Sequence, residues 1–257
     1  VAVTVILFTG GASVDNTPAA ADAATVLDQA AARTLLHGLR GEIPAAKFWY
    51  QRYVIRTRGQ AQASSEKWLS RTGSGRWRLT GRAAIDARFP TASWAGATTH
   101  SHIHFLNRGP WQAYSLTGRQ LSYRQMLRLT TSPRALLRVL APKAGTPRLF
   151  RNLTAFENVA GMLVQPALPA PLRAGLFRAL ALVGGARVLG RTTVAGQPAV
   201  IIGQLTAGML TEMLVNPKDG VWLEGRTLVH GKVVSDVRLV ASGLVDSTSQ
   251  TRISSGG

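Results

Sequence analysis

Alternation between apolar and polar residues predicts strands in the first half of the chain. The stretch 47–57, KFWYQRYVIRT, is rich in the aromatic and β-branched residues that favour strands. Successive strand side chains point to opposite faces. One face then carries Phe48, Tyr50, Arg52, Val54 and Arg56. The other face carries Trp49, Gln51, Tyr53, Ile55 and Thr57.

A β-hairpin is expected next. Residues 67–71 and 76–80 are short alternating runs on either side of a turn at 72–75, TGSG. In the second run Trp77 and Leu79 share one face, whereas Arg76 and Arg78 share the other. This alternation is typical of an antiparallel sheet with one covered face. Further short strands are expected up to about Phe105.

Apolar residues three or four positions apart predict a group of helices in the middle of the chain and one before the first strand. Asp22 is expected to cap a helix that ends near Leu39. The other helices are bounded by proline or glycine, as helix ends often are. They are expected at 121–129, 132–140, 147–164 and 171–183.

The part of the sequence that follows the helices predicts five strands. Together with the preceding elements, these strands indicate a fold class. These strands are expected at 186–194, 198–203, 210–215, 221–229 and 233–240. The string 216–220, NPKDG, predicts a hairpin loop, because Pro fixes one φ and Gly accepts a positive one. Short connections favour antiparallel pairing, and the lack of βαβ alternation argues against a doubly wound sheet. We expect an α+β fold: a curved antiparallel β-sheet, an open half-barrel, with a helical cluster packed on its concave face.

Positive charge is concentrated in one region. The formal net charge of the 257 residues is +18. Residues 40–160 hold 20 Lys and Arg against four acidic residues, a net charge of +16. Such a field attracts anions, including lipid head groups, wall polymers and nucleic acid.

The beginning of the chain predicts contact with a membrane. Val1 to Phe8, VAVTVILF, is an uninterrupted apolar run, and a small, polar linker follows it. Eight residues are too few to span a bilayer, so the run fits the tail of a membrane helix or signal segment; a first β-strand is the alternative. The expected domains are a membrane or signal remnant with linker at 1–20, one folded domain at 21–246, and a flexible tail at 247–257.

A series of motifs resembles a known family. The motifs are Ser122 to Leu140 (SYRQMLRLTTSPRALLRVL), the helix pair around Pro166 and Pro169, the turn Gly196-Gln197, and Thr211 to Gly220 (TEMLVNPKDG). Together they resemble an uncharacterised actinobacterial family of single-pass membrane proteins with an extracytoplasmic domain. That domain is similar to the LolA-like and RseB-like lipoprotein carrier superfamily. The resemblance covers most of the chain, although TTSP at 130–133 stands where the family has Pro-Thr-Asp-Pro. It implies a helix-lidded half-barrel at the extracytoplasmic face of the cell membrane, which holds lipid chains or peptide segments.

The sequence carries no catalytic signature. The chain has no cysteine, which excludes disulfides, thiolate zinc sites and cysteine nucleophiles. Glu66 and Asp86 are the only acidic residues between Pro44 and Phe156, and they form no recognisable acid/base pair. Nucleophile-elbow and phosphate-loop motifs are missing too. We therefore expect a protein that is not an enzyme and has no cofactor.

One histidine cluster leaves two interpretations open. His100, His102 and His104 share one face if they lie on a strand, with the outer pair roughly 13 Å apart. That distance is too long for one tetrahedral zinc, and the positive field opposes a cation. We predict no metal site, but metal binding and a pH-sensitive polar face both stay open for these residues.

The functional prediction rests on an apolar concave face that lies beside a basic flank. It is non-enzymatic extracytoplasmic binding of a hydrophobic or amphipathic ligand, lipid or lipoprotein, in a groove between sheet and helices. The expected apolar lining is Trp49, Trp68, Trp77, Phe156 and Phe177. The expected contacts to anionic head groups, in a ligand or at a membrane surface, are Arg52, Arg56, Arg76 and Arg78.

Two alternatives stay open. The first is an envelope sensor or protein-interaction domain whose sheet edge receives a partner segment. The second is nucleic-acid or polyanion binding through the basic region 40–160, with aromatic residues stacking on bases. Nucleic acid is disfavoured, because no RNA-recognition, OB-fold or zinc-finger signature is present.

Overall fold

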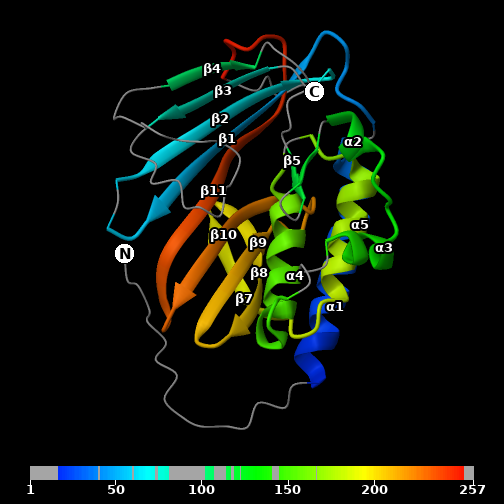
Figure 1. Cartoon of the computed structure of the whole chain (residues 1–257), viewed down its shortest axis with the longest axis vertical. Helices are drawn as coiled ribbons and strands as arrows, with labels where there is room; N and C mark the ends of the chain where they lie inside the picture. The colour runs from blue at the N-terminus through cyan, green and yellow to red at the C-terminus, as the bar shows by residue number, and fades with distance from the viewer. Residues whose placement is uncertain are drawn as a thin grey trace.

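One open, nine-stranded antiparallel sheet organises the protein (Figure 1). The computed structural model describes residues 17–39, 41–59, 61–72, 75–80, 102–106, 114–116, 119–121, 123–140, 145–165 and 167–251. Within these residues the strand order is β4-β3-β2-β1-β11-β10-β9-β8-β7, and the two end strands do not pair with each other. The nine strands are β1 (Phe48–Thr57), β2 (Ala63–Ser70), β3 (Gly75–Thr80), β4 (His102–Leu106), β7 (Arg187–Val194), β8 (Gln197–Thr206), β9 (Met209–Val215), β10 (Trp222–Val229) and β11 (Lys232–Val245).

Two meanders make up the sheet. Strands β1 to β4 follow one another on one side, and β7 to β11 follow one another on the other side. β1 and β11 join them, with pairing from Phe48↔Val245 to Thr57↔Ser235 and a register shift between Arg52 and Tyr53. The long antiparallel pair therefore connects the two halves of the chain.

The helices lie on one face of this sheet (Figure 1). They are α1 (Thr17–His37), α2 (Tyr123–Leu127), α3 (Pro133–Val139), α4 (Arg148–Leu163) and α5 (Ala170–Ala181). A separate two-stranded ribbon, β5 (Tyr114–Leu116) with β6 (Arg119–Leu121), lies beside α4. We call the sheet face that carries Tyr53 and Met213, which the helices cover, the inner face. The opposite face, which carries Tyr50 and Asp236, is the outer face.

One apolar core fills the space between the helices and the inner face. The apolar residues of α4 recur every three or four positions, as an amphipathic helix requires. The core members from α4 are Leu153, Phe156, Val159, Met162 and Leu163. They meet Val200, Ile202, Met213, Val215 and Trp222 of the sheet. The predicted α+β fold, with an open antiparallel sheet and helices packed on its concave face, is thus confirmed.

Several predicted boundaries differ from the structure. The first helix begins at Thr17, so the prediction that Asp22 caps it is wrong: Pro18 occupies the first turn, where its fixed φ is favourable. β2 already begins at Ala63, because it pairs with β1 as far as Ile55. β11 continues to Val245, because its pairing with β1 continues beyond the register shift. Pairing between distant segments thus extends strands beyond what local alternation shows.

The predicted hairpin loop at 216–220 is confirmed and also holds α1. The Asn216 side-chain oxygen accepts a hydrogen bond from the Lys218 amide, and Asp219 Oδ1 accepts one from the Val221 amide, both at 2.9 Å. Gly220 has a φ of 71°, which a glycine adopts without strain. A Cβ on Gly220 would lie 2.4 Å from the Ala30 carbonyl oxygen, so this glycine also permits close contact with α1.

Both ends of the chain extend beyond the described residues. The apolar run Val1–Phe8 and the linker as far as residue 16 lie outside them. No helix within the described part combines the length and the apolar character that crossing a bilayer requires. Of the predicted tail at 247–257, the structure describes residues up to Thr251; there the Gln250 carbonyl accepts a hydrogen bond of 2.8 Å from Trp68 Nε1.

Two helical glycines give a matched test of the packing between α3 and α5. A Cβ on Gly175 would lie 2.4 Å from the Thr131 carbonyl oxygen and 3.1 Å from Leu136 Cδ1, whereas a Cβ on Gly161 meets nothing within 4 Å. Gly175→Ala is expected to lower the free energy of unfolding by about 1–3 kcal/mol, because α5 must move away from α3. Gly161→Ala is expected to raise it by up to about 1 kcal/mol through helix propensity. Urea unfolding measures both, and equal effects of the two substitutions would contradict this packing.

Candidate functional site

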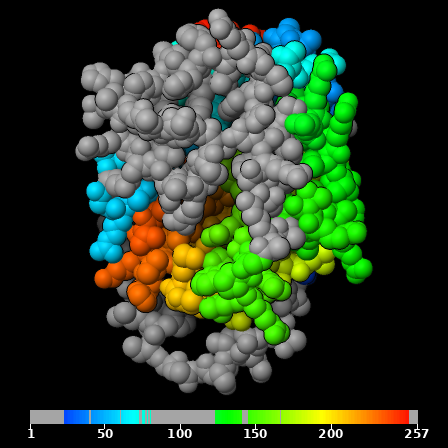
Figure 2. Space-filling model, viewed as in Figure 1, coloured from blue at the N-terminus to red at the C-terminus, as the bar shows by residue number. Residues whose placement is uncertain are grey.

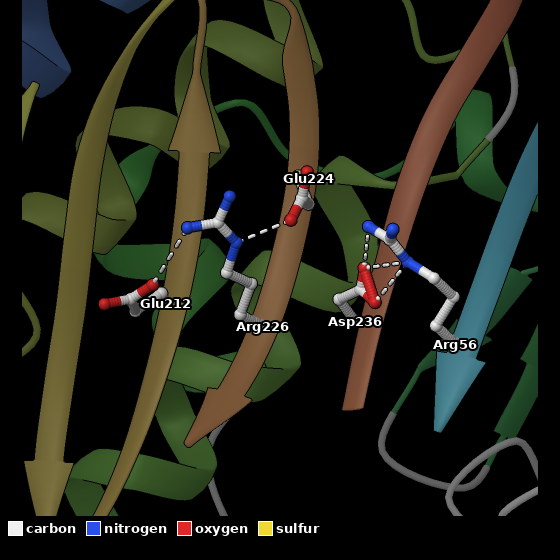
Figure 3. Close-up of polar contacts among 5 residues, drawn as sticks. All are labelled: Arg56, Glu212, Glu224, Arg226 and Asp236. Carbon is white, nitrogen blue, oxygen red and sulfur yellow. Dashed lines mark hydrogen bonds and ion pairs between the residues drawn. The ribbon is translucent and has the colours of Figure 1, made fainter. Parts of the chain in front are cut away.

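A row of charged side chains crosses the outer face of the sheet (Figure 3). Arg56 of β1 lies opposite Asp236 of β11, which lies opposite Arg226 of β10 and then Glu212 of β9. The Arg56 guanidinium donates to both oxygens of Asp236 at 2.7–2.9 Å. Arg226 Nε donates to Glu224 at 2.5 Å, and Arg226 Nη1 lies 3.8 Å from Glu212. Two guanidinium groups thus meet three carboxylates.

The carboxylates in this row are mostly buried, and their pairing is structural. Asp236 and Glu224 are 6% and 3% exposed. The hydrogen bond with Asp236 raises the pKa of Arg56. Burial raises the pKa of Glu212, with Arg226 acting in the opposite direction. Because opposite charges neutralise each other along the row, it offers little net field to a ligand.

Trp68 is the centre of a second cluster on the outer face. It is 1% exposed and lies against Tyr50, with the ring centroids 5.0 Å apart. The guanidinium carbons of Arg76 and Arg78 lie 5.5 and 5.6 Å from the Trp68 ring centroid, within the range of cation–π attraction. Glu66 accepts a 2.6 Å hydrogen bond from the Tyr50 hydroxyl and forms an ion pair with Arg78. The cluster is therefore closed by its own contacts.

The four arginines predicted to meet anionic groups all lie on the outer face, as their alternation indicated. Arg56 and Arg78 already hold carboxylates, and Arg76 donates to the Thr248 carbonyl at 3.3 Å. Arg52 is exposed. Their contact with an external anion stays a prediction.

The inner face of β1 and β2 has a different character. Trp49, Gln51 and Tyr53 follow one another on this face of β1, and Lys67 of β2 lies directly opposite Gln51. The Val164 carbonyl at the end of α4 accepts hydrogen bonds from Gln51 Nε2, at 3.2 Å, and from the Tyr53 hydroxyl. The last carbonyls of a helix lack intrahelical donors, so these two bonds satisfy one of them and fix β1 against α4.

Among the described residues, two buried polar atoms on the inner face of β1 have no hydrogen-bond partner. They are Trp49 Nε1, a donor, and Gln51 Oε1, an acceptor. An unpaired buried polar atom costs about 1–3 kcal/mol. Burial also lowers the pKa of the neighbouring Lys67 amine to about 8. We call Trp49, Gln51 and Lys67 the inner-face polar patch.

A second cation lies deeper under the helices. Arg173 of α5 lies near Tyr53, and burial lowers the pKa of Arg173. Among the described residues its guanidinium forms no ion pair within 4 Å. The charge of Asp219 acts on the pKa of Arg173 in the opposite direction, so Arg173 is compensated by an acidic residue without a direct ion pair.

The five residues predicted to line a groove do not form one surface. Trp49 is partly buried against the core on the inner face, whereas Trp68 is on the outer face. Phe156 and Phe177 are both fully buried in the core. The backbone of Trp77 lies opposite Lys67, next to the inner-face polar patch.

The sequence reasoning missed Gln51 and Lys67 as site residues. Lys67 alternates with Leu69 on one face of β2, and Glu66 alternates with Trp68 on the other face. Each face therefore pairs a charged residue with an apolar one, so local alternation could not show which charge faces the helices.

The described residues also line a small, partly open pocket, of about 60 Å³, between α1 and strands β7 to β9. It is lined by Val26, Gln29, Ala30, Arg191, Val200, Val215 and Pro217. This volume suits about two water molecules and is too small for an acyl chain. None of the inner-face polar patch lines it.

The predicted histidine cluster lies outside the described side chains. β4 includes the backbone of His102 and His104, and His100 precedes it. Elsewhere, among the residues that the structure describes, no group of three or more His, Cys, Asp or Glu could hold a metal ion.

Comparison with known proteins gives distant structural likenesses. Neither a family model nor a curated protein sequence matches the chain. The solved structure of MucB in complex with MucA(peri) is 14% identical over 88% of this chain and 56% of the MucB chain, with a TM-score of 0.34. A second MucB structure is 14% identical over 87% of this chain and 58% of its own, with a TM-score of 0.35.

A LolA superfamily protein from Nitrosomonas europaea is 9% identical over 86% of this chain and 92% of its own, with a TM-score of 0.21. The chain spans less than two thirds of the MucB chains that it matches. At such low sequence identities and TM-scores, these likenesses support no conclusion about the ligand or partner of this chain.

The cost of burying Lys67 is measurable. The pKa of Lys67 is about 8 in the folded protein, against about 10.4 in an unfolded chain, so the folded state disfavours the protonated amine. Lys67→Met is expected to raise the free energy of unfolding at pH 7 by about 1–2 kcal/mol, after allowance for the partial exposure of the residue. This gain is expected to shrink between pH 8 and pH 10, because the wild-type amine then becomes neutral in the folded state.

The matched control is Lys232→Met, at an exposed hairpin position, with an expected change below about 0.5 kcal/mol. Urea unfolding at several pH values measures both variants. A Lys67→Met protein that is less stable than the wild type at every pH would contradict the proposed cost.

Proposed function

We propose that this domain binds an amphipathic ligand with an anionic head group, without catalysis, at the inner-face polar patch. The observation that carries the proposal is a pair of buried polar atoms beside Lys67, Trp49 Nε1 and Gln51 Oε1, which have no hydrogen-bond partner within the described part of the chain. A ligand that satisfied both atoms would recover free energy that the unliganded protein loses. We place this binding on the extracytoplasmic side of a membrane, as the apolar run Val1–Phe8 and the sequence resemblance suggest.

The patch offers complementary groups to an anionic head group. The Lys67 ammonium and the Trp49 indole N–H both donate hydrogen bonds, and charge-assisted bonds to phosphate or carboxylate oxygens are the stronger kind. Gln51 Oε1 accepts, which suits a hydroxyl or amide N–H of the same head group. An anion beside Lys67 would favour the protonated amine, so binding above pH 8 would take up a proton.

An apolar row lies next to these polar groups. Leu244 of β11, Trp49 of β1 and Leu69 of β2 occupy consecutive register positions across three strands. Leu69 is fully buried, whereas Leu244 is 36% exposed. Hydrocarbon laid along the accessible end of this row would lose contact with water, which is the main favourable term for an acyl chain or an apolar peptide segment.

The charge distribution supports an anion rather than a cation. On the inner face β1 and β2 carry Lys67 and no acidic residue, because Glu66 lies on the outer face. Arg173 adds a second positive charge beneath α5. A cationic head group would be repelled by Lys67 there.

Calorimetric titration with two lysolipids tests the proposal. Lysophosphatidylglycerol, an anion, is expected to bind, and lysophosphatidylcholine, a zwitterion, is expected to bind more weakly. Lys67→Met is expected to weaken lysophosphatidylglycerol binding by about 10-fold or more, the effect of one charge-assisted hydrogen bond. Wild-type affinity is expected to fall between pH 8 and pH 9.5 as the amine deprotonates.

Lys218→Met, at an exposed position of the 216–220 loop outside the inner-face polar patch, is the control and is expected to bind like the wild type. Equal affinity for the two lysolipids, or unchanged binding by Lys67→Met, would overturn the proposal. A stoichiometric envelope protein recovered with the domain, with no lipid in either, would favour the protein-interaction alternative instead.

A further inference from the structure

Exposed apolar side chains gather at one end of the molecule. Six of the large apolar residues that are more than a third exposed lie on the tips of strands or at helix ends there. They are Leu149 (63%), Phe150 (37%), Leu182 (51%), Leu189 (44%), Leu205 (66%) and Val233 (47%). Exposed apolar side chains that gather in one place are a candidate site of interaction.

Contacts place these tips side by side. Asn152 near the start of α4 lies against Gly184 after α5, and Gly185 lies against Gln204 at the end of β8. The β8–β9 turn meets the β10–β11 turn, where the His230 amide donates to the Gly208 carbonyl at 3.3 Å.

The last residues of β1 also lie at this end of the molecule. The amide of Arg58, which follows β1, donates to the Val234 carbonyl of β11 at 2.9 Å. In Figure 2 the β10–β11 hairpin (orange), the β8–β9 hairpin (yellow) and the start of α4 (green) lie next to one another on the lower part of the visible face.

Basic residues accompany the apolar ones on the hairpin tips and helix ends that carry them. These segments are 57–59, 148–152, 182–189, 204–210 and 228–234, and none of them contains Asp or Glu; the start of α1, which lies at the same end, contains Asp22. Their cations are Arg58, Arg148, Arg151, Arg187 and Lys232. We call these five cations and the six apolar residues the basic rim.

The first turn of α4 departs from what helix stability favours. Arg148, Leu149, Phe150 and Arg151 are all exposed in consecutive positions. Cations at a helix N-terminus oppose the helix dipole, and this turn contains no acidic residue. Two arginines beside two exposed apolar side chains are therefore unfavourable for the isolated domain and suit an external surface that is both anionic and apolar.

We propose that the basic rim docks on the surface of an anionic lipid bilayer. Apolar side chains at the interface of a bilayer lose contact with water, and each nearby Lys or Arg is attracted by anionic head groups. The rim combines both features on hairpin tips and helix ends at one end of the molecule, which a planar bilayer can contact together.

The position of α1 supports a bilayer as the binding partner of the basic rim. α1 runs antiparallel to α5. At one end the Ala170 amide donates a hydrogen bond to the Leu39 carbonyl, and farther along Asp28 forms an ion pair with Arg178. α1 therefore begins at the end of α5 where the rim lies, and the residues before it include the apolar run Val1–Phe8. Any membrane association of that run would bring the rim toward the bilayer.

Rim docking is independent of ligand binding at the inner-face polar patch. The rim lies where β1, β8 and α5 end and where α4, β7 and β11 begin, whereas the patch lies on β1 and β2 at Trp49, Gln51 and Lys67. Failure of either proposal is therefore distinguishable, since Lys67→Met is expected to leave vesicle binding unchanged.

Vesicle co-sedimentation of the full chain tests the docking. Wild-type protein is expected to bind vesicles of phosphatidylglycerol and phosphatidylcholine at least about 10-fold more tightly than vesicles of phosphatidylcholine alone. The double variant Arg148→Glu with Lys232→Glu is expected to bind anionic vesicles more than about 25-fold more weakly, at about fivefold for each cation lost. Leu149→Gln with Leu205→Gln is expected to weaken binding to the same vesicles by about 10-fold or more.

Matched variants away from the rim separate this surface from general charge or hydrophobicity. Arg134→Glu with Arg138→Glu on α3 makes the same change in net charge, and Leu36→Gln removes an exposed leucine at the opposite end of α1. Both control variants retain residues 1–16, as the wild type does, and both are expected to bind the anionic vesicles like the wild type. Since all substituted side chains are exposed, unchanged thermal unfolding checks that each variant folds.

Three outcomes would overturn the proposal. They are wild-type protein that does not bind anionic vesicles, rim variants that bind like the wild type, and control variants that lose as much binding as the rim variants. Capture of an envelope protein that depends on the rim, without vesicle binding, would assign the rim to a protein partner and would also overturn it.

Discussion

The antiparallel pairing of β1 with β11 is the interaction on which the rest of the structure depends. It joins two meanders that are each made of local hairpins, and its register decides which side chains of both halves share a face. Arg56 reaches Asp236 only because these residues lie opposite each other in that register. The register shift between Arg52 and Tyr53 lets the pairing continue, so Trp49 and Leu244 also meet. A one-residue slip would exchange the inner and outer faces of one half relative to the other.

The two faces of the sheet differ in how their charged side chains are arranged. On the outer face, carboxylates from β2, β9, β10 and β11 neutralise arginines, so a strongly basic chain has a sheet surface with mostly internal pairs. On the inner face, Lys67 and Arg173 lie under partial or full burial, and burial lowers both of their pKa values. Strongly perturbed pKa values cluster at functional sites. The contrast explains why the inner face, although less charged overall, is the better candidate for an anionic ligand.

The location of cations therefore matters more than their number. Most of the net charge lies in residues 40–160, yet several arginines of that region are held by carboxylates of distant strands. The five cations left at the basic rim come from four separate segments that the fold brings to one end. Net charge thus indicated an attraction to anions, and tertiary structure selected the places where that attraction is available.

Local sequence patterns were enough to predict the fold class, most of the helices and strands, and the alternation of side chains along each strand, but not the ribbon β5–β6. Strong local signals did this: proline and glycine at helix ends, the loop at 216–220, and the period-two pattern of 47–57. The start of α1 at Thr17 and the full lengths of β2 and β11 were not determined, because they depend on a first-turn proline and on partners far along the chain. Only the tertiary structure decided that Trp68 lies on the outer face while Lys67 faces the helices. Local alternation fixes which residues share a face, but the face that becomes buried is chosen by the packing of helices that come later in the chain.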